Sequence, residues 1–197
     1  MGALLGLLPD AIRTATDALI LPGGDLADRV WAWRGLVDDL YDGVVTTVES
    51  IVARQAPVAR DLRFLLGCLR LVPTLYDSVD LVADISAPST VGLDAVISAR
   101  TSHLLRAVGE HTALTWSAVE TFWSARDAPA LSAVRQHDDA LAEVRSALSA
   151  EFGAGGVDLS AAMQLALVGR SFERLGRHAA TAAQVIVGLG PKRSDEA

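Results

Sequence analysis

Apolar residues recur along most of this chain at intervals of three and four, which places them on one face of an α-helix. The clearest stripe runs from Leu62 to Val79, shortly after a proline at position 57. Proline suits the first turn of a helix and disfavours helical backbone in the residue before it. The pattern therefore predicts that one helix ends near Arg54 and that a long helix begins near Pro57.

Breakers and capping residues divide the rest of the chain in the same way. The expected helices span residues 4–21, 25–54, 57–86, 92–126, about 129–152 and 158–188. We expect the regular part of the first helix to start at Pro9, and Pro73 to kink the third. Asp158 is expected to cap the last helix, and no segment requires a strand. The pattern predicts an all-α protein.

The second half of the chain resembles the first. Sliding the sequence by 97 residues places Asp61-Leu62 on Asp158-Leu159, and Leu75-Tyr76 on Phe172-Glu173. Six helices with an internal repeat indicate two antiparallel three-helix units packed as a bundle. We assign the first unit to residues 1–88 and the second to residues 89–190, and we expect a disordered tail over 191–197.

Composition and charge argue against several classes of function. Hydrophobic residues make up 51% of the chain, which is enough for a sizeable core, but no run reaches the roughly 18 apolar residues of a membrane-spanning helix. The start lacks the basic residues of a secretory signal, so we expect a cytoplasmic protein. A net charge of −7 argues against nucleic-acid binding. The single cysteine, Cys68, cannot form an internal disulfide and reads as a small buried residue.

Three segments carry a family resemblance. The sequence ARQAPVARDLR at residues 53–63, with GGDLADRV at 23–30 before it and FERLGRHA at 172–179 after it, resembles the PhoU family of phosphate-uptake regulators. The first segment matches a family block of a glutamine, a proline and an Asp-Leu-Arg triplet. These are Gln55, Pro57, Asp61, Leu62 and Arg63. The resemblance extends from about residue 11 to 189 and implies two tandem three-helix units. It makes Asp61 and Arg63 candidates for a structural or interaction role.

The resemblance also implies carboxylate pairs, four residues apart, which hold multinuclear metal clusters in some members. The corresponding pairs here are Arg34 with Asp38, Tyr76 with Asp80, Asp138 with Ala142, and Glu173 with Arg177. Each pair retains one acid. Clustered carboxylates repel one another unless a cation compensates them, and an arginine can replace a metal in that role. We expect no cofactor, and we expect Arg34 to neutralise Asp38 or Asp80 while Arg177 pairs with Glu173.

Other residues allow further interpretations. Asp139 and Glu143 preserve the four-residue spacing and remain the best alternative metal candidates beside the single acids of the four pairs. His137 and His178 lack a second ligand at metal-site spacing, so ordinary boundary histidines are favoured. Trp31 is either an exposed anchor at a protein interface or part of the core. No arrangement of residues indicates catalysis.

The resemblance implies a regulatory adaptor in phosphate homeostasis. Its expected partners are the ATPase of a phosphate ABC transporter, a sensor histidine kinase, or both, and membrane association would occur only through them. A second copy of the chain is a further candidate partner. Two alternatives stay open: an accessory subunit of a secondary phosphate transporter, and a carboxylate metal-binding bundle. The second would need Glu-x-x-His pairs, which the sequence lacks.

Overall fold

The computed structural model describes residues 1–21, 25–88, 97–126, 128–153 and 159–190. Six helices account for the regular structure of these residues: α1 (Gly2–Ile20), α2 (Asp25–Gln55), α3 (Ala59–Ser86), α4 (Ala99–Ala125), α5 (Ala128–Gly153) and α6 (Leu159–Leu189). The described residues contain no strand, and the predicted all-α class is confirmed. In the same part of the chain, no helix is long and apolar enough to span a membrane.

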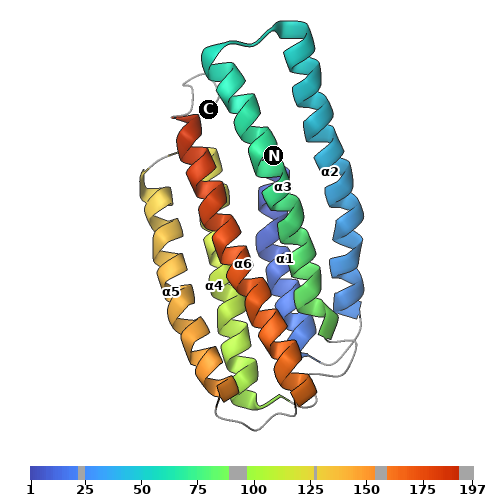
Figure 1. Ribbon diagram of the computed structural model, residues 1–197, viewed down its shortest axis with the longest axis vertical. Helices are drawn as coiled ribbons and strands as arrows, with labels where there is room; N and C mark the ends of the chain where they lie inside the picture. Colours follow the sequence, from blue (N-terminus) through green and yellow to red (C-terminus); the bar gives the residue numbers. More distant parts are fainter. Residues whose placement is uncertain (22–24, 89–96, 127, 154–158, 191–197) are drawn as a thin grey trace.

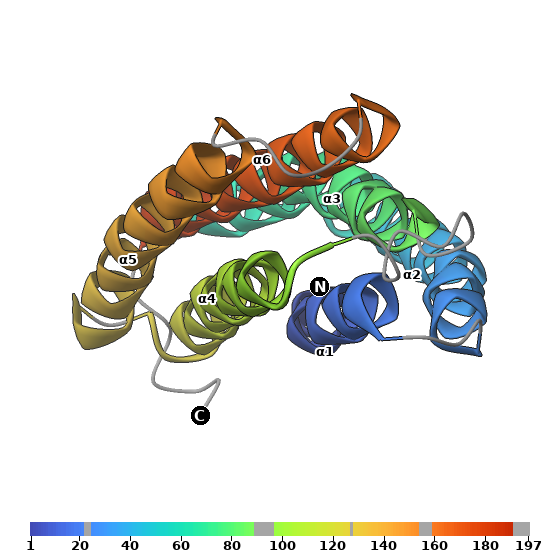
Figure 2. The ribbon, with the colours of Figure 1, turned by 90° about the horizontal axis from the view of Figure 1, so that it is seen from below.

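The helices form two layers (Figures 1 and 2). Seen along the bundle in Figure 2, α2, α3, α6 and α5 form a curved layer, and α1 and α4 lie side by side within its concave face. The two halves of the chain meet where α1 packs against α4 and where α3 packs against α6. Helices in corresponding positions of the two halves therefore occupy corresponding places in the bundle.

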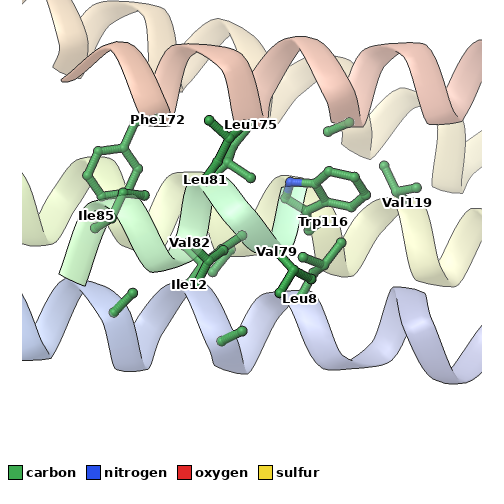
Figure 3. Close-up of a cluster of buried hydrophobic side chains, with 14 of the residues drawn as sticks. Leu8, Ile12, Val79, Leu81, Val82, Ile85, Trp116, Val119, Phe172 and Leu175 are labelled. Carbon is green, nitrogen blue, oxygen red and sulfur yellow. The ribbon is translucent and has the colours of Figure 1, made fainter. Parts of the chain in front are cut away.

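One continuous hydrophobic core joins all six helices. Its largest fully buried side chains include Trp116 on α4 and Phe172 on α6. Figure 3 shows both in one cluster with Leu81 and Ile85 of α3 and Ile12 of α1, with Phe172 at the Ile85 end and Trp116 toward Val119 of α4. Burying a large apolar side chain contributes roughly 1.5–3 kcal/mol. The helix stripes seen in the sequence therefore converge on one core that the two halves share.

The starts of the first and fourth helices differ from the prediction. The first helix starts at Gly2 and contains Pro9, because the buried Leu4 and Leu5 extend its apolar face upstream. The fourth starts at Ala99 rather than near residue 92, because Ser98 caps it by accepting a hydrogen bond from the Thr101 amide (3.0 Å). Asp158, expected as a cap, and the tail at 191–197 lie outside the described residues.

The third helix also starts later than predicted, at the junction between α2 and α3. The third helix starts at Ala59, so Pro57 precedes it instead of occupying its first turn. Ala56 and Ala59 have positive φ angles of 43° and 50°, which are uncommon for residues with a side chain. The left-handed backbone at these positions reverses the chain direction between the two antiparallel helices.

Candidate functional site

Four side chains on α2 and α3 correspond to two of the expected carboxylate pairs. Arg34 lies on α2 with its Nη2 3.1 Å from Oδ1 of Asp80 on α3. Tyr76 on α3 donates a hydrogen bond to Asp38 on α2, and this bond to an anionic acceptor raises the pKa of the Tyr76 hydroxyl. The Tyr76 ring also meets Tyr41 edge-on, with the ring centroids 5.5 Å apart. We call Arg34, Asp38, Tyr76 and Asp80 the first polar cluster, and its polar groups bind one another.

The corresponding positions on α5 and α6 form a second polar cluster: Asp138, Ala142, Glu173 and Arg177. Arg177 Nη1 donates to Glu173 Oε1 at 2.7 Å, in the favourable arrangement with the acid one turn before the arginine. Asp138 faces Gly176 of α6, where an added Cβ would lie 3.6 Å from its Oδ1. Arg34, expected to neutralise Asp38 or Asp80, thus contacts Asp80, and Arg177 pairs with Glu173 as expected.

These residues do not fit a multinuclear metal cluster. A metal competes for carboxylate oxygens, and in each polar cluster a guanidinium already contacts one of the acids. Asp139 and Glu143 lie exposed on α5. Over the described residues, no three side chains of the types His, Cys, Asp and Glu come together at a spacing that could hold an ion. The structure thus places the sequence-predicted ligands on neighbouring helices without gathering them into a site.

A groove beside the second polar cluster was missed by sequence reasoning. It lies between α5 and α6, has a volume of about 700 Å³, and is lined by Arg145, Arg170 and Arg177 together with Glu173. The available signal was the spacing of Arg170, Arg174 and Arg177, which follows the helical period along α6. That spacing does not show that Arg145, on another helix, lines the same groove.

The family-like segment at the start of α3 borders a second cavity. Gln55, Pro57 and Asp61 line this cavity of about 310 Å³ together with Phe64. Arg126, in a left-handed conformation at the end of α4, also lines it, and its guanidinium carbon lies 4.8 Å from the Trp123 ring centroid. Arg63 is exposed on α3, and the side chain of Trp31 lies outside the described part of the chain. The interaction roles predicted for Asp61, Arg63 and Trp31 stay predictions.

A polar contact between α3 and α6 was likewise not predicted. His178 Nδ1 lies 2.9 Å from Ser78 Oγ, and the same hydroxyl donates to the carbonyl of Thr74 at 2.6 Å. The Ser78 oxygen is therefore free to accept a hydrogen bond from the imidazole. Burial, helped by the nearby charge of Arg174, lowers the pKa of His178. His178 is a partnered boundary residue joining the two halves of the bundle.

Comparison with known proteins identifies the fold. No family model matches the sequence, and no curated protein matches it. The structure is similar to the crystal structure of PhoU from Pseudomonas aeruginosa, with a TM-score of 0.81 and 22% identity over 95% of this chain and 91% of that chain. It is also similar to the phosphate transport system regulatory protein PhoU from Streptococcus pneumoniae, with a TM-score of 0.82 and 17% identity over 95% and 90% of the two chains. The predicted PhoU-like fold is confirmed.

Proposed function

We propose that this protein is a regulatory adaptor of phosphate homeostasis, which restrains phosphate ABC transport and phosphate-starvation signalling by binding other proteins. The observation that carries the proposal is the match of 95% of the chain to two PhoU structures, one of them described as a phosphate transport system regulatory protein. The sequence block around Pro57 supports the same relationship independently. The proposed partners are the ATPase of the transporter, a sensor histidine kinase, or both.

The two polar clusters support an adaptor role rather than metal chemistry. In each polar cluster an arginine contacts one carboxylate, and in the first the Tyr76 hydroxyl also binds Asp38. Such side chains present a fixed pattern of charges on the surface of long helices, and charge patterns of this kind give interfaces specificity. Docking on α2, α3, α5 and α6 therefore requires no bound ion.

Deletion of the gene tests the regulatory role. In a strain grown with abundant phosphate, a phosphate-starvation reporter should become constitutively active, and a plasmid copy of the gene should silence it again. Phosphate uptake measured in the same cultures distinguishes the alternative. Altered uptake with a silent reporter would contradict the signalling role and favour an accessory subunit of a secondary transporter.

Metal analysis tests the replacement of metal by arginine. The purified, untagged protein should contain no stoichiometric iron, zinc, manganese or magnesium, because Arg34 and Arg177 occupy the acids that would bind these ions. Several ions per chain, retained after gel filtration, would contradict this and favour a carboxylate metal-binding bundle.

A further inference from the structure

The groove between α5 and α6 carries positive charge on an acidic protein. Three guanidinium groups line it, from Arg145, Arg170 and Arg177, against the single carboxylate of Glu173. The whole chain has a net charge of −7. The positively charged guanidinium groups in the groove repel one another, and a bound anion would reduce that repulsion.

The arginines differ in how they are held. Arg177 is fixed by its 2.7 Å contact with Glu173. Within the described part of the chain, Arg145 and Arg170 have neither an ion pair nor a side-chain hydrogen bond. Guanidinium is a planar group that binds phosphate and carboxylate oxygens through two parallel hydrogen bonds. Two such groups are thus available to a ligand beside one that is already oriented.

The remaining walls suit a ligand with polar and apolar parts. Ser146 and Ser149 bring hydroxyl donors to the α5 side, and Leu148 and Ala166 supply apolar surface. An added Cβ at Gly169 would meet no atom within 4 Å, so the groove is open along α6. Its volume of about 700 Å³ lies within the range of small-molecule sites and greatly exceeds the size of one phosphate ion.

We infer that this groove binds a small organic phosphate ester. The phosphoryl group accepts hydrogen bonds from Arg145 and Arg170, and the carbon part of the ligand covers the apolar wall. A phosphate ester offers three acceptor oxygens, which matches several guanidinium and hydroxyl donors better than a single carboxylate does. The inference rests on the groove alone and does not depend on the proposed adaptor role.

Isothermal titration of the full-length protein at low salt tests the ligand class. The probes are adenosine 5′-monophosphate, glycerol 3-phosphate, their unphosphorylated parent compounds, inorganic phosphate and a polyglutamate peptide. At least one ester should bind more tightly than its parent compound and more tightly than inorganic phosphate. Failure of both esters, equal binding by inorganic phosphate, or binding of the peptide alone would overturn the inference.

Matched variants test the location. Arg145→Gln and Arg170→Gln should each weaken ester binding about tenfold or more, since each removes a charge-assisted hydrogen bond. Arg70→Gln removes the same charge from an exposed position on α3, away from the groove, and should bind like the wild type. Ala142→Glu should weaken binding through its added carboxylate, whereas the neutral Ala142→Gln should have a much smaller effect. Circular dichroism confirms that each variant is folded, and an equal loss in Arg70→Gln would overturn the assignment.

Discussion

Individual polar side chains tie the two halves of the bundle together. Arg13 on α1 binds Glu110 on α4 through two hydrogen bonds, from Nε at 3.0 Å and from Nη2 at 3.1 Å. On the other layer, His178 of α6 contacts Ser78 of α3. Each contact joins residues about one hundred positions apart in sequence, so these interactions form only when the halves are assembled.

Glu110 should make stability depend on pH in the acid range. Its hydrogen bonds from Arg13 lower the pKa of the carboxylate below its ordinary value of 4.5. As the pH falls, Glu110 is therefore protonated in the unfolded chain before it is protonated in the folded protein. The stability that Glu110 contributes is present above pH 4.5 and is lost as the pH falls through the pKa of the folded state. Glu110→Gln should cost about 0.5 kcal/mol at neutral pH, because the pair is partly solvent-exposed. Urea unfolding should show this difference shrinking below pH 4.5.

The control for that measurement is Glu49→Gln, which removes an exposed carboxylate from α2. It should leave the free energy of unfolding nearly unchanged at neutral pH. A loss as large as that of Glu110→Gln would show that general charge, rather than the contact with Arg13, causes the effect.

His178 should make the stability depend on pH at higher pH values than Glu110 does. Burial is the main cause that lowers its pKa from 6.5; the charge of Arg174 acts in the same direction, Asp77 opposes it, and Arg177 adds the smallest lowering effect. As the pH falls below 6.5, the unfolded state is protonated before the folded state, so stability falls until the folded pKa is passed. Thermal melts of His178→Gln should be less sensitive to pH in this window than those of the wild type. His103→Gln, which removes an exposed imidazole from α4, should keep the wild-type dependence.

At the scale of the helices, a glycine determines how closely α1 and α4 approach. Gly109 lies buried in α4, and a Cβ added there would overlap the side chain of Thr16 on α1. From the sequence alone, Gly109 is expected only to destabilise the fourth helix locally, because glycine has a low helix propensity. The structure shows that the missing side chain is what allows the two inner helices to pack.

Gly109→Ala should therefore destabilise the protein despite the better helix propensity of alanine. Overpacking costs roughly 1–3 kcal/mol, against a gain of about 1 kcal/mol from propensity. The control Gly35→Ala, on the exposed side of α2 with no atom within 4 Å of the new Cβ, should stabilise by up to about 1 kcal/mol. Chemical denaturation measures both. Adding Thr16→Ala to Gly109→Ala should recover part of the loss, and an absence of recovery would contradict the packing argument.

At the scale of the whole molecule, the two repeats share one core. Buried residues of α1 and α3 contact those of α4 and α6, and the cluster extends without a break across the boundary between the halves. Either half alone would expose these apolar faces to water. The division into two repeats, residues 1–88 and 89–190, stays a prediction. Because the core is shared, we expect that neither repeat folds alone.

We expect residues 1–88 alone to lack a cooperative thermal transition and to bind the hydrophobic dye ANS. The full chain should unfold in one step, with coincident tryptophan fluorescence and far-ultraviolet circular dichroism. A sharp, reversible melt of the 1–88 fragment would contradict this expectation and would show that the repeats fold independently.

Sequence reasoning predicted local features well and missed contacts between distant residues. It predicted the ends of α2 and α3 to within two residues of their positions in the structure. It also predicted the ion pair of Glu173 and Arg177, which lie one helical turn apart. It placed the start of α4 too early, because the segment before Ser98 continues an apolar pattern without a cap. It found neither the contact of Ser78 with His178 nor the groove that includes Arg145.

The sequence by itself determined the six helices, the repeat and the likeness to PhoU, because helical period, caps and breakers act between residues a few positions apart. It also determined the loss of half of each carboxylate pair, which is a matter of residue identity. Only the tertiary structure decided that Arg34 reaches Asp80, that Gly109 makes room for Thr16, and that arginines from α5 and α6 line one groove. These depend on the rotation and axial position of each helix against its neighbours, and the packing of the shared core sets both.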